Sequence, residues 1–434
     1  MNKKRLFIRS AVAIAVAASS TSALAAGFQL NAQSATGIGR AFAGDAVIAD
    51  NASVMARNPA AMALFDEKAF SIGFESITTQ IEVKDAKYCG PACEVTNGAI
   101  PATTVDDTDD VGGTSIAPNI HFIMPLNEKF AVGVNAYSNF GTKTEFADDY
   151  VAAEYGGLTD VKSFNFGLAG SYRLNEQWSF GAGIDVIYAE GTLIRKPSAQ
   201  VTGALSLNTQ TQPLVGQPLL SVDGATGIEV GFNVGTVYEL DENNRFGFAY
   251  RYSPEFEAED DKGQTITLPL PDIAEFSGFH KIEDTKFAVH YSVQYIGWGA
   301  FDQIEFSNLQ GSVVSGDYNK AYGWQDGWHY SIGGTYYLNN DWTLRAGYMY
   351  DTSAQDELTS ISVPDSDRQW FSTGLTYNLD RSSTIDFGFT YLMGEKVSVN
   401  ESTQNPLDGS TLSSVSATTQ ANAILMGLQY SRSF

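Results

Sequence analysis

The segment FNFGLAGSYRLNEQWSFGAGIDVIY, residues 164–188, decides the fold class of this 434-residue chain. On each side of its polar centre, LNEQW, large apolar side chains alternate with small or polar ones. One face carries Phe164, Phe166, Leu168, Tyr172 and Leu174, and then Trp178, Phe180, Ala182, Ile184, Val186 and Tyr188. A period of two is the side-chain period of a β-strand. The segment therefore predicts two strands joined by a tight turn.

The same alternation recurs from Ala69 onward, for example over residues 230–240 and 287–295. In a soluble sandwich the apolar face of such a strand meets a core. In an outer-membrane barrel it meets lipid, while the small or polar face meets the lumen. Alternation alone fits both architectures, so the connections between the strands have to separate them.

Two kinds of connection alternate along the chain. Six are tight polar turns flanked by apolar residues, at 126–130, 174–178, 240–246, 282–287, 338–342 and 379–381. Seven are longer and polar, near residues 80–116, 141–161, 196–225, 258–271, 300–326, 353–368 and 398–418. Short turns at one rim and long loops at the other are typical of bacterial outer-membrane barrels.

Thirteen such connections join fourteen strands and leave both chain ends on the side of the short turns. The chain ends LQYSRSF, and a closing strand with a terminal Phe resembles the assembly signal of outer-membrane barrels. A closed barrel leaves no unpaired strand edge in lipid. We therefore expect an all-β fold, a 14-stranded antiparallel transmembrane β-barrel over residues 66–434.

The residues that precede the strands divide into two parts. Residues 1–25 have a basic start, a short apolar run and the cleavage pattern Ala23-Leu24-Ala25, which predict an export signal. Residues 26–65 are small and polar and follow no sustained period of two. Such a segment cannot build a core of its own. We expect it to be a plug, or hatch, enclosed by the barrel.

Composition excludes some functions and leaves others open. A net charge of −24 argues against nucleic-acid binding. Cys89 and Cys93 predict a small loop disulfide in an oxidising compartment. A metal site there is the weaker interpretation, since no further Cys and no nearby His completes it. We expect no metal and no cofactor. The acidic run at 106–110 either attracts divalent cations or, more often, is a solvated loop.

The loop at 197–222 carries a possible sign of the substrate. Seven aliphatic residues interrupt an otherwise polar stretch: Leu205, Leu207, Leu214, Val215, Leu219, Leu220 and Val222. They form either a binding groove for an apolar ligand or simple packing between loops.

A fourteen-stranded lumen is too wide to be filled by side chains, so it is a channel or is plugged.

Several motifs resemble the FadL-type long-chain fatty acid transporters of Gram-negative outer membranes. They are AGFQL at 26–30, SATGIGRAFAG at 34–44, RNPA at 57–60, PNIHF at 118–122, YSNFG at 137–141 and SVPDSDRQW at 362–370. The resemblance covers essentially the whole chain and is weakest in the long loops. It implies a fourteen-stranded barrel with a hatch, an apolar pocket, and substrate exit through the wall at a kinked third strand.

Matched by position, the resemblance assigns roles to individual residues. It implies that Phe28 moves to unblock the pocket, and that Arg195 and Lys320 hold the polar head of the ligand. The hatch triplet falls on Asn58, Pro59 and Ala60, and the kink on Asn139, Phe140 and Gly141. From the alternation of residues 181–185 alone, Arg195 is also expected to point into the lumen.

The sequence therefore predicts a passive, ligand-gated channel for long-chain fatty acids in the outer membrane, with both termini in the periplasm. We expect a monomer that contacts outer-membrane lipid and lipopolysaccharide, and no catalytic residues. A channel for aromatic or aliphatic hydrocarbons is one alternative, although a hydrocarbon needs no cations. A barrel lipase is another, and it requires a Ser–His pair on the outer face; the four histidines at 121, 280, 290 and 329 are scattered singly.

Overall fold

The computed structural model describes residues 27–207, 209–404 and 410–434. The predicted export signal, residues 1–25, lies outside the described residues. Within the described part of the chain, no helix is both long enough and apolar enough to cross a membrane.

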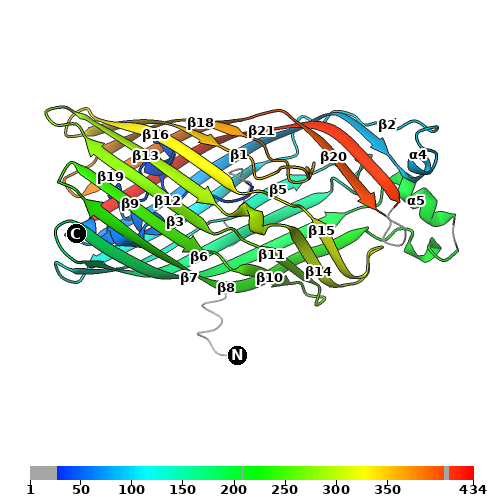
Figure 1. The fold of residues 1–434 in the computed structure, drawn as a ribbon, viewed down its shortest axis with the longest axis horizontal. Coiled ribbons are helices and arrows are strands. Elements are labelled where there is room, and N and C mark those ends of the chain that lie inside the picture. The colour runs from blue at the N-terminus through cyan, green and yellow to red at the C-terminus, as the bar shows by residue number, and fades with distance from the viewer. Residues whose placement is uncertain (1–26, 208, 405–409) are drawn as a thin grey trace.

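The strands form one closed antiparallel barrel of fourteen transmembrane strands (Figure 1), which confirms the predicted fold class. The first strand, β1, closes the barrel by pairing with the last, β21, from Ala69↔Ser433 to Cys89↔Ser414. Within the described residues, six transmembrane strands are interrupted and consist of two segments each. In chain order the strands are β1 (Ala69–Cys89), β3 (Thr114–Pro125), β4 (Phe130–Tyr137) with β5 (Gly141–Glu145), β6 (Leu158–Arg173), β7 (Trp178–Arg195), β8 (Leu220–Glu239), β9 (Asn244–Tyr252) with β10 (Glu255–Glu259), β11 (Thr265–Pro269) with β12 (Ile273–Lys281), β13 (Phe287–Ile296) with β14 (Gln303–Leu309), β15 (Gly316–Ala321) with β16 (Gly327–Tyr337), β17 (Trp342–Asp351), β18 (Arg368–Asn378), β19 (Ser383–Gly394) with β20 (Val397–Gln404), and β21 (Thr411–Ser433).

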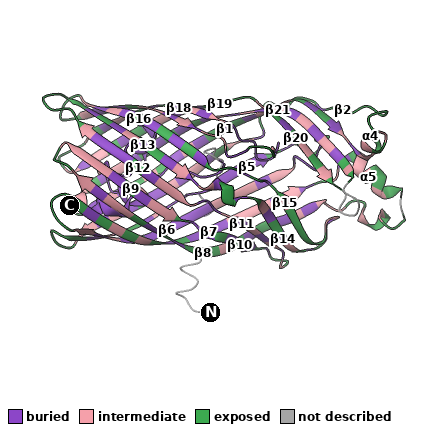
Figure 2. Ribbon diagram, in the orientation of Figure 1, coloured by how far each residue is buried: buried purple, intermediate pink, exposed green. Residues whose placement is uncertain are grey.

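The two faces of the strands separate as the alternation predicts (Figure 2). Leu168 and Ile184 are 61% and 56% exposed on the outer face, whereas Ser179 and Asp185 are each 1% exposed on the lumen side. Phe164 differs from the other large residues of its predicted face, because only 3% of it is exposed. It lies where the ladder from β6 to β4 and β5 is interrupted.

All six predicted tight turns are present at one rim, and a backbone hydrogen bond closes each of them. An example is the 2.9 Å bond that the Leu174 amide donates to the Trp178 carbonyl. The side chain of Asn175 accepts from the amides of Gln177 and Trp178, which is why Asn suits this turn. Just beyond the turns, aromatic rings of neighbouring strands pair, as Trp178 and Tyr238 do at 4.7 Å between centroids. Such rings suit a membrane interface.

The opposite rim is more regular than the sequence predicts. Strands extend into six of the seven stretches expected to be polar connections, all except 353–368. Polar side chains do not prevent this, because pairing satisfies the backbone groups whatever the side chains are. The remaining elements at this rim are β2 (Thr103–Thr104), α4 (Pro91–Val95), α5 (Ala199–Ser206), the turn η2 (Gln212–Leu214) and, at the break between β13 and β14, η3 (Trp298–Ala300).

Residues 27–64 lie inside the barrel and are almost all buried (Figures 1 and 2). They form three short helical elements, α2 (Ala35–Ile38), α3 (Val54–Arg57) and η1 (Pro59–Leu64). Ion pairs join the segment to the wall: Arg57 pairs with Glu275, and Asp50 accepts from Arg345 at 3.2 Å. Asp50 also pairs with Arg40 inside the segment at 2.8 Å. The lumen is therefore plugged.

Candidate functional site

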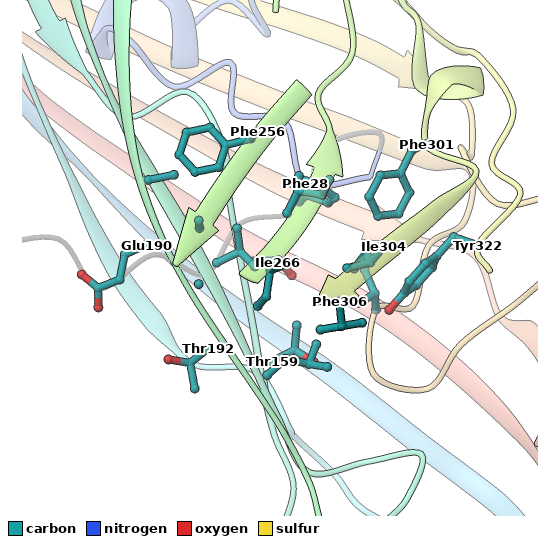
Figure 3. Close-up of a pocket in the computed structure, with 18 residues that line it drawn as sticks. Phe28, Thr159, Glu190, Thr192, Phe256, Ile266, Phe301, Ile304, Phe306 and Tyr322 are labelled. Atoms are coloured by element: carbon teal, nitrogen blue, oxygen red, sulfur yellow. The ribbon is translucent and has the colours of Figure 1, made fainter. Parts of the chain in front are cut away.

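An apolar cavity, here the outer cavity, lies inside the barrel on the side of the long connections (Figure 3). Its walls come from β5–β7, β10, β11, β14, the residues after β15 and one long loop. The lining residues are Phe28, Thr142, Thr159, Val161, Ala189, Glu190, Gly191, Thr192, Leu193, Phe256, Ala258, Ile266, Leu268, Phe301, Ile304, Phe306, Tyr322 and Val363. Most are aliphatic or aromatic, so the cavity suits a hydrocarbon chain.

Phe28 is 4% exposed and belongs to a cluster of rings at one end of the outer cavity. Its ring centroid lies 4.6 Å from Trp298, 5.6 Å from Phe301, 5.8 Å from Trp324 and 6.3 Å from Phe140. Reasoning from the sequence missed both tryptophans, since they lie in or next to a connection expected to be polar. Their only signal is the run of aromatic residues in GWGAF at 297–301 and YGW at 322–324.

Arg195 ends β7 on the lumen side and is 4% exposed. Its Nη1 donates to the carbonyls of Leu158 and Ile194, and its Nη2 donates 2.8 Å to the hydroxyl of Thr159, which lines the outer cavity. The guanidinium thus lies directly behind a polar group of the lining.

Lys320 lies behind another polar group of the same lining. Its Nζ is 5.3 Å from the ring centroid of Tyr322 and 2.9 Å from Oε1 of Glu401 in β20. The structure brings Arg195 and Lys320 to the same region, yet neither side chain lines the cavity itself.

The third transmembrane strand is interrupted at residues 138–140, between β4 and β5. The β3–β4 ladder stops at Asn119↔Tyr137, so residues 114–118 of β3 pair with β1 alone among the described strands. Contact resumes where the amide of Glu145 donates 2.8 Å to the carbonyl of Val111. Between these two points the ladder that joins β3 to the next strand is missing.

Residues 28–30 pair with the interrupted segment from inside. The amide of Gly141 donates to the Phe28 carbonyl at 2.9 Å, and that of Leu30 to the Asn139 carbonyl at 2.8 Å. Gln29 and Phe140 form an isolated antiparallel bridge. The start of the plug therefore serves as a short extra strand on the kink.

Asn58 ties the predicted hatch triplet together. Its side chain accepts from the amide of Ala60 and donates to the carbonyls of Ala46 and Thr236, the latter on the wall. Two glycines of the wall face the triplet. A Cβ on Gly235 would lie 2.0 Å from the Asn58 side chain, and a Cβ on Gly181 would lie 2.3 Å from the Ala60 amide nitrogen. Missing side chains on the wall allow this close approach.

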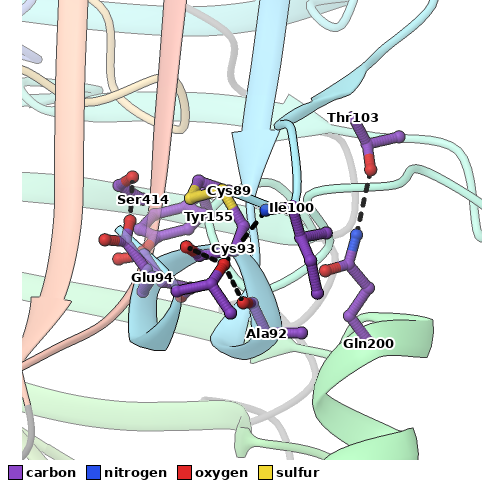
Figure 4. The surroundings of a disulfide bond; sticks show 11 residues. Cys89, Ala92, Cys93, Glu94, Ile100, Thr103, Tyr155, Gln200 and Ser414 are labelled. Carbon is purple, nitrogen blue, oxygen red and sulfur yellow. Dashed lines mark hydrogen bonds between the residues drawn. A yellow bond between two sulfur atoms is a disulfide. The ribbon is translucent and has the colours of Figure 1, made fainter. Parts of the chain in front are cut away.

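Cys89, at the end of β1, and Cys93, in α4, are joined by a disulfide at the opposite rim (Figure 4). Beside it, Glu94 accepts 2.5 Å from the hydroxyl of Ser414 in β21. Gln200 of α5 donates 3.0 Å to Thr103 of β2. The disulfide belongs to a small structured cap, far from the tight turns.

The aliphatic residues of the loop at 197–222 divide between the two interpretations given above. Leu220 and Val222 are buried in the core that surrounds the outer cavity, whereas Leu207 is 89% and Val215 41% exposed.

Three histidines are buried among hatch and wall groups; His121, for example, contacts the Gln33 carbonyl. Among the described residues, no group of three or more His, Cys, Asp or Glu side chains is placed to hold a metal.

Residues 16–434 match the family model described as outer membrane protein transport protein (OMPP1/FadL/TodX). This chain belongs to that family. A "Long-chain fatty acid transport protein" of Salmonella typhi is 36% identical over 92% of this chain and 95% of its own length. "Outer membrane protein P1" of Haemophilus influenzae is 35% identical over 99% of both. A Pseudomonas aeruginosa FadL homologue of known structure, 19% identical, has the same fold, with a TM-score of 0.78 over 94% of this chain and 100% of its own. The protein is an outer-membrane transport barrel.

Proposed function

We propose that the protein is a passive channel that admits long-chain fatty acids and releases them sideways through the wall. The observation that carries this proposal is the position of Phe28. It closes one end of an apolar cavity, and its own backbone pairs with the interrupted strand. A movement of residues 27–30 would open the cavity and unpair the kink at once.

The proposed binding mode follows from the chemistry of the lining. Each methylene of a fatty acid buried in the outer cavity contributes about 0.8 kcal/mol. The carboxylate requires a cation or hydrogen-bond donors once water is excluded. In this proposal it lies at the Thr159 and Tyr322 end of the cavity, where Arg195 and Lys320 supply positive charge.

The remaining parts have proposed roles that fit this route. Residues 1–25 are an export signal, 26–65 form the hatch with Asn58, Pro59 and Ala60 as its anchor, and 66–434 form the barrel. The protein acts as a monomer surrounded by outer-membrane lipid and lipopolysaccharide, and it is not an enzyme. The relative named as a long-chain fatty acid transport protein supports the substrate class. The relative named as an outer membrane protein supports the compartment.

Uptake of radiolabelled oleate by a Gram-negative host that lacks its own long-chain transporter tests the proposal. Expression of this chain is expected to restore rapid uptake. Toluene uptake is measured in the same cells. Rapid uptake of toluene with none of oleate would replace the proposal with a hydrocarbon channel, and release of fatty acid from an ester would favour the lipase.

A further inference from the structure

A second cavity, here the inner cavity, lies beyond Phe28. The two cavities are neighbours, because Phe28 lines the outer one and the next residue, Gln29, lines the inner one. Asn139 and Phe140 of the kink also line the inner cavity. It therefore lies at the point where the wall is interrupted.

The inner cavity is polar, in contrast to the outer one. Its charged lining residues are two arginines, Arg57 and Arg251, and one glutamate, Glu275. Arg57 pairs with Glu275 at 2.5 Å, and Arg251 pairs with Asp185 behind the lining. Each guanidinium group is thus paired with one carboxylate, so the cavity offers an anion hydrogen-bond donors of charged groups and no excess of positive charge.

Two hydrogen-bond donors of the lining have no protein acceptor among the described residues. They are Nε of Arg57, on a side chain 9% exposed, and Nδ2 of Asn139, on a residue 5% exposed. A buried donor without a partner costs roughly 1–3 kcal/mol. Sites that leave such groups open usually receive their partner from a ligand or from water.

We propose that the inner cavity is a second binding site for the carboxylate of a long-chain acid, held by Arg57 Nε and Asn139 Nδ2 during exit. The inference rests on the proposed function. Once residues 27–30 move, the chain leaves through the interrupted wall and the head group reaches the inner cavity last. Arg57 and Asn139 then discriminate an acid from a neutral chain of equal length, because only the acid carries an anionic acceptor.

The test compares initial rates of uptake of oleate and of oleyl alcohol, which differ only in the head group. Asn139→Asp is close to isosteric and keeps the acceptor oxygen that Ser163 uses at 2.6 Å, but it replaces the open donor by an oxygen. Oleate uptake is expected to fall about tenfold or more, the size of one hydrogen bond to a charged group, while oleyl alcohol uptake stays unchanged. Arg57→Lys keeps the charge opposite Glu275, removes Nε, and is expected to act in the same direction.

Asn135→Asp is the matched control, since Asn135 lies on the same strand and faces the lumen but does not line the inner cavity. Heat-modifiable migration of each variant checks that the barrel has folded. Equal effects of Asn139→Asp and Asn135→Asp, or equal losses of oleate and alcohol uptake, would overturn the inference and leave the proposed function intact. Absence of oleate uptake by the unmodified protein would instead overturn the proposed function.

Discussion

Lys320 is charged but already has a partner. Glu401 holds it at 2.9 Å and is itself fixed by the hydroxyl of Ser360 at 3.3 Å. A ligand carboxylate therefore competes with Glu401 for the ammonium group.

Because Glu401 and the ligand compete for Lys320, substitutions of Glu401 and of Lys320 are expected to change the affinity for oleate in opposite directions. Glu401→Gln removes the competing charge and is expected to tighten oleate binding to the purified protein about tenfold. Lys320→Met removes the cation and is expected to weaken oleate binding by a similar factor, as for one hydrogen bond between charged groups. Titration calorimetry with oleate measures both changes. Oleyl alcohol is the control ligand, and equal shifts for the alcohol would show that the variants only alter the shape of the site.

Single residues of this site were predictable from the sequence to different degrees. The side of the wall on which Arg195 lies follows from alternation, because the lumen side is set by a period of two. The partners of Arg195 and Lys320 do not follow, since Thr159 and Glu401 approach them from other strands. Trp298 and Trp324 were missed because nothing local marks a long connection as part of a buried cluster.

The kink is a one-residue irregularity of an otherwise regular element. Tyr137 pairs with Asn165, and Gly141 pairs with Lys162. The chain thus advances four residues from Tyr137 to Gly141, while the paired positions on β6 differ by only three residues. One extra residue in a strand bends it and leaves it locally unpaired. The interruption therefore follows from the extra residue between β4 and β5 as well as from Gly141.

Deletion of Ser138 removes the extra residue and keeps every pairing on both sides in register. We expect the strand to straighten, the wall to close and oleate uptake to fall sharply. Gly141→Val is the milder variant, because a β-branched residue favours a regular strand. Uptake assays measure the effect, and surface expression with heat-modifiable migration shows whether the barrel folds. Normal uptake by a folded Ser138 deletion would rule out exit at this strand.

Elements with strong local signals were predicted well and those set by pairing were not. The six tight turns follow from Asn or Asp between apolar residues, a signal contained in a few residues. The extension of strands above the membrane has no such signal, because polar residues there pair with neighbours distant in sequence. The resemblance to a known family placed the kink at residues 139–141, whereas the strand is interrupted at 138–140 and Gly141 is the first residue of β5.

At the scale of the whole molecule, the question is whether the plug leaves the barrel during transport. The plug is held along its length: Arg57 pairs with Glu275, Asp50 with Arg345, and the Ala35 amide bonds to the Gln429 side chain at 3.2 Å. Of the two ion pairs, Arg57–Glu275 is buried, and removing one partner of a buried pair costs about 3–5 kcal/mol. Release of the whole plug would break several of these contacts at once, whereas a movement of residues 27–30 breaks mainly short backbone pairs and ring contacts.

A covalent lock separates these two possibilities. A Cβ on Gly427 would lie 3.1 Å from Cβ and 2.9 Å from Cα of Ala35, which is shorter than the roughly 3.5–4.5 Å between the Cβ atoms of a disulfide. The two backbones must therefore separate slightly, and Ala35→Cys with Gly427→Cys is then expected to join the plug to β21. The lock leaves residues 27–30 free, and we expect oleate uptake by the oxidised double variant to match that of its reduced form. Each single cysteine variant and the unmodified protein, treated with the same reductant, control for effects on the Cys89–Cys93 bond. Uptake that stops on oxidation and returns on reduction would mean that the substrate passes through the space the plug occupies, because the only change is that the plug cannot leave.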